Sequence, residues 1–223
     1  MLNPPSNFKE LLARYRRLQV IAPHPDDEVF GAAGLVQLAA LKGLKITVHI
    51  ATDGENCFGS LPAGKELELR KARRQESCYA SQLLGYPEPQ FWDLGDGQLS
   101  RQSRRLQALI QQHHCRETLW VAPWQEDGHP DHNATGQAVS ALELPSLFYP
   151  VWALVDSVRL TSFLSKDRIC SLDLSANLLE RKARAAQLFT TQFADDQRDE
   201  GPVIAHQHLQ HFVTDKEMYW HAN

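Results

Sequence analysis

Short apolar runs rich in branched side chains alternate along this sequence with longer segments in which apolar residues recur at helical spacing. The short runs are typical of buried strands, and we expect strands at 18–22, 45–51, 90–93, 118–122, 147–151 and 168–172. The longer segments are typical of helices, expected over 8–16, 28–41, 65–84, 101–114, from 132 onward and over 175–189. Strands that alternate with helices predict a three-layer α/β fold, with helices on both faces of a mostly parallel sheet.

The length of 223 residues suits one domain with a buried core, and no internal repeat is visible. We therefore expect a single domain over 1–223. The segment 18–152 carries the motifs described below, whereas 153–223 carries no motif that can be placed. Hydrophobic residues make up 43% and charged residues 22% of the chain, which is ordinary for a globular protein.

Charge and cysteine usage narrow the classes of partner and compartment. The formal net charge of −4 provides no basic footprint for nucleic acid or for an anionic membrane. The four cysteines are scattered and form no CxxC pair, which favours reduced thiols. The N-terminus does not resemble a signal peptide, and no stretch is long and apolar enough to span a membrane. We expect a cytoplasmic protein with a small-molecule substrate, and a homo-oligomer stays open.

Two dense groups of metal-binding side chains each follow a predicted strand, at 22–28 and at 127–132. Ligands of open α/β sheets bind beyond the carboxyl ends of the strands, which is where both groups fall. Either group alone would be explained by solvated carboxylates in a turn set by proline. Two such groups at two strand ends favour a metal site.

Zinc prefers imidazole and carboxylate donors, and a catalytic zinc keeps one coordination position open for water. His24 and Asp27 are three residues apart across a turn, so both can point at one centre, and His132 could supply a third ligand. Asp26 stands beside a ligand but points elsewhere, which leaves it free as a general base. The same ligand set also suits other divalent ions such as Fe²⁺.

The second group contains a further pair, His129 and Asp131. We expect Asp131 to hydrogen-bond one ring nitrogen of His129 and to stabilise its protonated form. His129 could then stabilise an oxyanion or protonate a departing amine. Both roles suit the hydrolysis of an amide.

These residues resemble the LmbE-like family, also called the N-acetylglucosaminyl-phosphatidylinositol de-N-acetylase (PIG-L) family. Its first signature resembles AHPDDE, present here as PHPDDE at 23–28, and its second, HPDH, is present at 129–132. The resemblance is close over about 20–138. Further matching positions are TDGE at 52–55, the helix residues Arg73, Glu76, Ala80, Leu84 and Gly85, the turn Asp96-Gly97, the pairs Pro123-Trp124 and Asp127-Gly128, and more loosely Lys182, Ala185 and Gln192.

The resemblance implies zinc bound by His24, Asp27 and His132, with Asp26 as the base. It also implies that His129, paired with Asp131, stabilises charge near the scissile bond. The implied fold is Rossmann-like, with the active site at the carboxyl ends of the strands. The implied substrates are N-acetylglucosamine conjugates, among them phosphatidylinositol-linked sugars, inositol or malate glycosides, and antibiotic or polysaccharide precursors.

The helix around Arg73 allows two interpretations. The family often places an arginine here that reaches the substrate, so Arg73 is a candidate substrate-binding residue. Its neighbours Arg70 and Arg74 suggest instead a solvated helix face, of which only one arginine can point inward. Glu76 could orient Arg73 or form an exposed pair along the helix.

Other candidates for substrate binding are weaker. Asp53 and Asp96 follow predicted strands and could bind a sugar hydroxyl, although capping of a turn explains them equally well. Trp124, beside the HPDH loop, is the best candidate for stacking on a sugar ring. The spacing of His208 and His211 fits one helical face, and we expect both on the surface.

The sequence therefore predicts a zinc-dependent hydrolase that removes an N-acyl group, most simply acetyl, from an amino-sugar conjugate. One alternative is a metallophosphoesterase, which would bind two metal ions. The other alternative is an inactive sugar-binding module.

Overall fold

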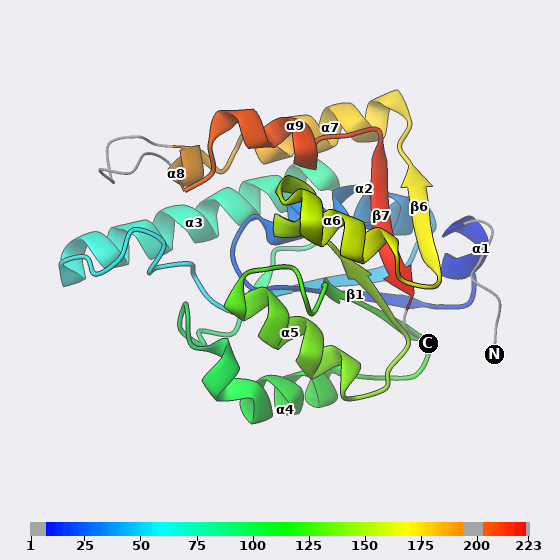
Figure 1. Ribbon diagram of the computed structural model, residues 1–223, viewed down its shortest axis with the longest axis horizontal. Helices are drawn as coiled ribbons and strands as arrows, with labels where there is room; N and C mark the ends of the chain where they lie inside the picture. The colour runs from blue at the N-terminus through cyan, green and yellow to red at the C-terminus, as the bar shows by residue number, and fades with distance from the viewer. Residues whose placement is uncertain (1–7, 194–202, 222–223) are drawn as a thin grey trace.

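The computed structural model describes residues 8–193 and 203–221 as one sheet covered by helices on both sides (Figure 1). The sheet has seven strands in the order β3-β2-β1-β4-β5-β7-β6. The first five pair in parallel, and β7 runs antiparallel to both of its neighbours. The strands are β1 Arg17–Ala22, β2 Lys45–Ile50, β3 Gln90–Phe91, β4 Thr118–Pro123, β5 Ser146–Tyr149, β6 Ile169–Asp173 and β7 Lys216–His221.

The expected three-layer α/β fold with a mostly parallel sheet is confirmed. Figure 1 shows α2, α3 and α7 above the sheet and α4 and α5 below it. The helices are α1 Phe8–Leu12, α2 Asp27–Leu41, α3 Ala63–Leu84, α4 Ser103–His113, α5 Pro130–Ser140, α6 Ser157–Leu164, α7 Ala176–Ala186, α8 Thr190–Phe193 and α9 Leu209–Phe212, with 3₁₀ turns at η1 Leu99–Gln102, η2 Trp152–Val155 and η3 His206–His208. In the described parts of the chain, no helix has the length and apolarity needed to cross a membrane.

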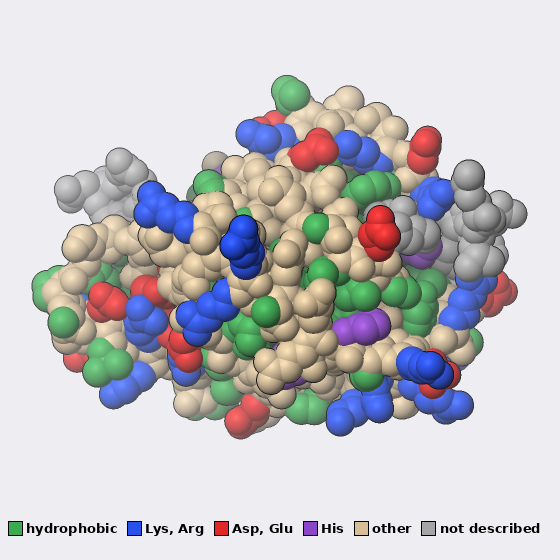
Figure 2. Space-filling model, turned by 90° about the horizontal axis from the view of Figure 1, so that it is seen from below, with side chains coloured by type: hydrophobic (Ala, Val, Ile, Leu, Met, Phe, Trp, Pro, Cys, Tyr) green, Lys and Arg blue, Asp and Glu red, His purple; other side chains and the backbone are tan. Residues whose placement is uncertain are grey.

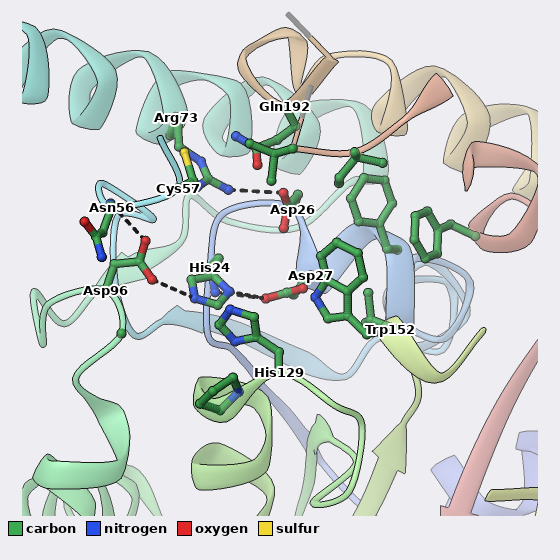
Figure 3. A pocket seen from close by; sticks show the side chains of 17 residues that line it. His24, Asp26, Asp27, Asn56, Cys57, Arg73, Asp96, His129, Trp152 and Gln192 are labelled. Atoms are coloured by element: carbon green, nitrogen blue, oxygen red, sulfur yellow. Dashed lines mark hydrogen bonds and ion pairs between the residues drawn. The ribbon is translucent and has the colours of Figure 1, made fainter. Parts of the chain in front are cut away.

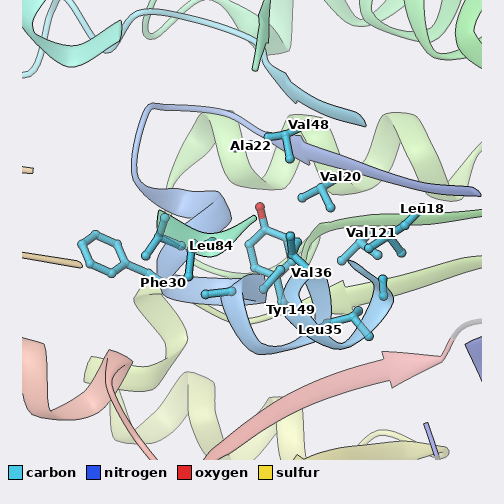
Figure 4. Packing of buried hydrophobic residues seen from close by; sticks show 14 of the residues in the cluster. Leu18, Val20, Ala22, Phe30, Leu35, Val36, Val48, Leu84, Val121 and Tyr149 are labelled. Atoms are coloured by element: carbon cyan, nitrogen blue, oxygen red, sulfur yellow. The ribbon is translucent and has the colours of Figure 1, made fainter. Parts of the chain in front are cut away.

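Consecutive residues of a strand point to opposite faces of the sheet, and this alternation divides the core in two. Val20 packs on the α2 side, whereas its neighbour Ile21 packs on the α4 and α5 side with Trp120. Figure 4 shows the first of these cores, in which Val20 and Tyr149 pack against α2. On the side of the molecule seen in Figure 2, basic and acidic side chains are interspersed.

Helix α2 approaches β5 closely because Gly31 has no side chain. A Cβ atom at Gly31 would lie 2.0 Å from Cδ2 of Tyr149, which no packing tolerates. The Tyr149 hydroxyl donates a hydrogen bond of 2.9 Å to the carbonyl of Ile21 in β1. The start of α2 is thereby held against β1 and β5, directly beneath the PHPDDE turn.

The last third of the chain departs most from expectation. A strand near 168–172 was expected and is present as β6, but β7 was not predicted, nor were α6, α8 and α9. Strand β7 lies between β5 and β6, and its exposure alternates along KEMYWH. Its inward positions include the charged Glu217, which is 3% exposed. A charged residue at an inward position hides the apolar alternation that would identify a strand.

Glu217 connects β7 to two helices through a buried network. It accepts hydrogen bonds from the backbone N–H groups of Gly34 and Leu35 in α2, at 2.7 and 3.0 Å. Lys182 of α7, 1% exposed in its side chain, donates to Glu217 at 2.8 Å and to the carbonyl of Phe30 at 3.0 Å. The Tyr219 hydroxyl donates to the same carboxylate. This network fixes the C-terminal strand against α2 and α7.

We expect Glu217→Ala to lower the free energy of unfolding by about 3–5 kcal/mol, because the substitution leaves the Lys182 ammonium buried without its partner. Urea unfolding followed by circular dichroism measures this loss. The matched control is Asp173→Ala, which breaks the exposed ion pair of 3.7 Å between Asp173 and Lys216 on the same strand pair. An equal loss in both variants would contradict the role of the buried network.

Candidate active site

The two metal-type groups lie side by side at the carboxyl ends of β1 and β4. The PHPDDE turn joins β1 to α2, and the loop before α5 follows β4. The two strands pair in parallel, with Val20 opposite Val121, so their carboxyl ends coincide. A cavity of about 420 Å³ opens there, and His24, Asp26, Asp27 and His129 line it (Figure 3).

His24 and His132 both face the carboxylate of Asp27. The Oδ2 atom of Asp27 lies 3.2 Å from Nδ1 of His24 and 3.2 Å from Nε2 of His132. Zinc bonds of about 2.0–2.1 Å in a tetrahedral arrangement place neighbouring ligand atoms about 3.3 Å apart. Both distances to Asp27 agree with this spacing, but the group whose ligand atoms all lie within 4.8 Å of one another is His24, His129 and His132. The residues His24, Asp27 and His132 are each less than one-tenth exposed.

The charge arrangement also fits a cation. His132 uses Nδ1 for a 2.7 Å hydrogen bond with Asp127, so the lone pair on Nε2 of a neutral ring would face the Asp27 carboxylate. Within the described structure, no hydrogen bond reaches this buried Nε2 atom. Burial opposes a charged ring, but the contacts with Asp27 and Asp127 outweigh it and raise the pKa of His132 to about 9. Without a metal ion, the His132 ring therefore holds a proton on Nε2, the atom that faces Asp27. The same atom would bind a metal ion if the ring were neutral.

In both His24 and His132, the ring nitrogen that faces away from Asp27 contacts another carboxylate. Asp127 is fully buried and also accepts backbone hydrogen bonds from residues 151, 152 and 153, at 2.8, 3.0 and 3.0 Å. On the far side of His24, Nε2 lies 3.1 Å from Asp96 and 3.4 Å from Asp131. A carboxylate behind a ligating imidazole sets its tautomer and orientation. Sequence reasoning missed this role of Asp127, although its place five residues before His132 could have suggested it.

Asp26 is held in an unusual conformation beside the cavity. Its φ angle is 128°, where side chains are strained, and it forms the N-cap of α2. The Asp26 N–H donates to Glu28 at 3.0 Å, and Arg73 donates to Asp26 Oδ2 at 3.1 Å. Burial and the neighbouring Asp27 raise the pKa of Asp26 well above its usual value, and Arg73 partly offsets this rise. Held by these contacts, Asp26 lines the cavity.

The contact between His129 and Asp131 differs from the expected one. The backbone N–H of Asp131, not its carboxylate, approaches Nδ1 of His129 at 3.2 Å. The Asp131 carboxylate instead accepts the N–H groups of Gly97 and Leu99 at 2.7 and 3.2 Å. Burial, together with His24 and His132, lowers the pKa of His129 to about 4. His129 is therefore neutral, with its proton on Nε2, rather than the carboxylate-stabilised imidazolium that we expected.

With this geometry established, comparison with known proteins identifies the chain. A sequence model described as PIG-L, GlcNAc-PI de-N-acetylase, matches residues 19–143, which include both signatures. The chain belongs to the PIG-L family. It is accordingly an N-deacetylase, a metal-dependent amide hydrolase.

Individual relatives agree with this family. Diacetylchitobiose deacetylase of Thermococcus kodakarensis is 28% identical over 193 residues, which are 81% of this chain and 72% of that protein. The structure of N,N'-diacetylchitobiose deacetylase from Pyrococcus horikoshii with its inhibitor superposes with a TM-score of 0.63 at 19% identity, covering 86% of this chain and 76% of that one. The zinc-inhibited form of teicoplanin deacetylase Orf2 gives 0.61 at 15% identity, over 92% and 97%. The two structural matches show a shared fold.

Of the three predicted substrate-binding residues of this PIG-L protein, two line the cavity and one does not. Arg73 is the arginine that points inward; it is 2% exposed and lines the cavity. Asp96 lines the cavity as well, but it also contacts His24 and accepts the N–H of Asn56 at 2.9 Å. Trp124 does not line the cavity: it is 1% exposed and packs edge-on against Phe163 in the core. The tryptophan beside the metal-type cluster is Trp152.

Asp53 and Glu76 connect parts of the fold through hydrogen bonds. Asp53 accepts hydrogen bonds from Arg70 and Arg74 and so ties the TDGE loop to α3. Glu76 is buried and accepts hydrogen bonds from the side chain of Thr190 and from the backbone and side chain of Thr191, at 2.7–2.9 Å. These bonds anchor α8 beside the cavity. The charge of Glu76 also contributes to the raised pKa of Arg73, so only the exposed alternative is wrong.

Several residues that line the cavity were not predicted from the sequence, because most are apolar and several lie in the segment after residue 152. They are Phe30, Asn56, Cys57, Val151, Val203, Ile204 and Phe212. Gly97, Pro130 and Gln192 also line it; they matched the family pattern without an assigned role.

The metal-free protein should become less stable as the pH rises. The pKa of His132 is about 9 in the fold against 6.5 as its ordinary value. A raised folded pKa stabilises the protein fully below about pH 6.5, and this contribution, on the order of 3 kcal/mol, is lost as the pH rises through about 9. Urea unfolding of chelator-treated protein at several pH values between 6.5 and 9.5 measures the decline.

His132→Gln should give a shallower decline with pH, since it removes one of the two stabilised rings; the pKa of His24 is raised as well. His206→Gln, on an exposed 3₁₀ turn, is the control and should keep the wild-type slope. A His132→Gln slope equal to that of the wild type would contradict the assignment.

Proposed function

We propose that this chain is a zinc-dependent deacetylase that hydrolyses the N-acetyl group of an N-acetylglucosamine-type conjugate. The observation that carries the proposal is that the Asp27 carboxylate faces both His24 and His132 at 3.2 Å, beside the carboxylate of Asp26. The relatives support the substrate class, because diacetylchitobiose deacetylase acts on an N-acetylated amino sugar.

In this proposal His24, Asp27 and His132 hold the metal ion, and the residues behind them hold these ligands. Two imidazoles and one carboxylate suit zinc, and Fe²⁺ would also be accepted. When bound, zinc polarises the acyl carbonyl and lowers the pKa of a water molecule. The fold similarity to the zinc-inhibited form of teicoplanin deacetylase Orf2 is consistent with a site of this kind.

Asp26 is the proposed general base. Arg73 occupies its Oδ2 atom, which leaves the second oxygen for the water molecule that attacks the carbonyl carbon. The positive charges of Arg73 and of a bound metal ion favour the ionised carboxylate that a base requires. After accepting the proton of water, Asp26 is placed to deliver it to the departing amine nitrogen.

His129 is the proposed oxyanion donor. Its Nδ1 atom accepts the N–H of Asp131, so the neutral ring presents Nε2–H to the cavity. A neutral donor stabilises the charge that develops on the acyl oxygen without needing to be protonated first. Asp131 and Asp96 act through His24, as positioning residues.

A metallophosphoesterase with two metal ions is disfavoured by the same geometry. Among the described residues, two groups of three side chains could hold a metal ion, His24 with His129 and His132, and His24 with Asp96 and Asp131, so both share His24. In the second group, Asp96 and Asp131 both contact Nε2 of His24, so they would orient this ring rather than hold a second ion. Metal analysis that finds one ion per chain agrees with this assignment, and two ions would contradict it.

The base assignment is tested with zinc-loaded protein and a methyl glycoside of N-acetylglucosamine, by measuring acetate release. The wild type should release acetate, and a chelator should abolish the release. Asp26→Asn should retain zinc and lose about 10²–10⁴-fold in kcat, which is the usual contribution of a general base. The exposed Asp167→Asn is the control and should keep full activity. Wild-type turnover in Asp26→Asn would refute Asp26 as the base.

The ligand assignment is tested by zinc stoichiometry after dialysis. His132→Ala should lose the ion. Asp127→Asn should bind it about 10–100-fold more weakly, because Asp127 only orients the ring. Glu126→Ala, on the same loop and exposed, should bind zinc like the wild type. Full occupancy in His132→Ala would remove this histidine from the ligand set.

A further inference from the structure

The cavity has two differently lined sides around the metal-type cluster. Figure 3 shows Asn56 and Asp96 on one side of His24, and Trp152 beyond Asp27 on the other. The first side is polar and suits sugar hydroxyl groups. The second side, here called the apolar arm, is lined by Phe30, Val151, Trp152, Val203, Ile204 and Phe212.

The apolar arm is built by three distant segments that are held in place. The rings of Phe30 in α2 and Phe212 in α9 stack with their centroids 4.7 Å apart. The N–H of Ile204 donates to the carbonyl of Gln192 at 3.0 Å, and Glu76 anchors the neighbouring α8. Phe30, Ile204 and Phe212 are each at most 3% exposed. The apolar arm is therefore preformed rather than a stretch of open surface.

The charges beside the apolar arm argue against an anionic occupant. Of the described residues that line the cavity, Arg73 is the only lysine or arginine. Its guanidinium is already engaged with Asp26 and with the carbonyls of Gly54 and Pro25, at 2.7–3.1 Å. Arg159, outside the cavity lining, pairs with Asp156 at 3.2 Å. A phosphate or carboxylate in the apolar arm would lose its hydration without gaining a cation.

We propose that the substrate carries an alkyl or aryl substituent that binds the apolar arm, in preference to a charged substituent. This inference rests on the proposed function, since it places the scissile amide at the metal-type cluster between the two sides of the cavity. The substituent belongs either to the acyl group or to the aglycone of the amino sugar. Each methylene that leaves water for the apolar arm strengthens binding in the transition state.

Phe212 sets the length of the apolar arm. A second cavity of about 320 Å³ adjoins the first, and Phe30 and Phe212 line both. Its other lining residues include the apolar Leu154, Leu160 and Met218 on one hand, and the charged Lys182, Lys216 and Glu217 on the other. Removing the Phe212 ring would join the two cavities and lengthen the space open to a substituent, with Lys182 and Glu217, which pair with each other, at its far end.

The test compares kcat/KM of zinc-loaded protein for two substrate series. One series lengthens the acyl group of methyl glucosaminide from acetyl to butyryl, hexanoyl and octanoyl. The other keeps N-acetyl and varies the aglycone from methyl to hexyl and phenyl. We expect kcat/KM to rise roughly fourfold per added methylene in one series until the apolar arm is filled, and that series identifies the source of the substituent. No rise in either series, or a preference for N-acetylglucosamine 1-phosphate, overturns the proposal.

Variants locate the binding of the substituent. Phe212→Ala should raise the ratio of kcat/KM for the longest substrate to that for the shortest, and Phe212→Leu should do so less strongly while preserving more of the core. Val203→Arg should lower the same ratio and improve the 1-phosphate. Val158→Ser on α6, where the side chain is 78% exposed, is the control and should leave the ratio unchanged. Unchanged ratios in Phe212→Leu and Val203→Arg would overturn the apolar arm as the binding site.

Failure of this inference is distinguishable from failure of the proposed function. Acetate release that persists with no dependence on chain length overturns the apolar substituent alone. No release from any amide substrate by zinc-loaded protein overturns the proposed function itself.

Discussion

Much of this structure depends on a single carboxylate oxygen, Oδ2 of Asp27, which faces two imidazole nitrogens at 3.2 Å. Buried in the fold, these three groups need a positive charge between them, supplied by protons on the rings or by a metal ion. The two surrounding loops are shaped to keep them there. Each ring has a carboxylate behind it, and Asp127 is in turn fixed by backbone N–H groups.

Burying so many charged groups lowers the stability of the fold. Burial raises the pKa of Asp26 and Glu28, and Asp26 also has a strained backbone. The fold compensates with apolar packing directly beneath, where Gly31 lets α2 approach Tyr149 of β5. Strain and buried charge persist only where the surrounding structure is rigid. The site is consequently placed on strand ends and helix starts and not on long loops.

The C-terminal third of the chain completes the cavity without contributing to the metal-type cluster. Strand β7 is locked to α2 and α7 through Glu217, and α8 is anchored to α3 through Glu76. Between these anchors, Val203, Ile204 and Phe212 form one wall of the cavity. The metal-type cluster and this wall of the cavity thus come from different parts of the chain.

The sequence by itself determined the alternation of strands and helices, the family, and the two groups of metal-type residues. These features are local: residues such as His24 and Asp27 are three apart, and a strand followed by a helix positions them regardless of the rest. Only the tertiary structure decided which carboxylate stands behind which ring, that Trp152 and not Trp124 faces the cavity, and that Glu76 holds α8. It also revealed β7, whose inward charge is tolerated because Lys182 meets it from another helix. Such pairings join residues far apart in the chain, and no spacing along the sequence records them.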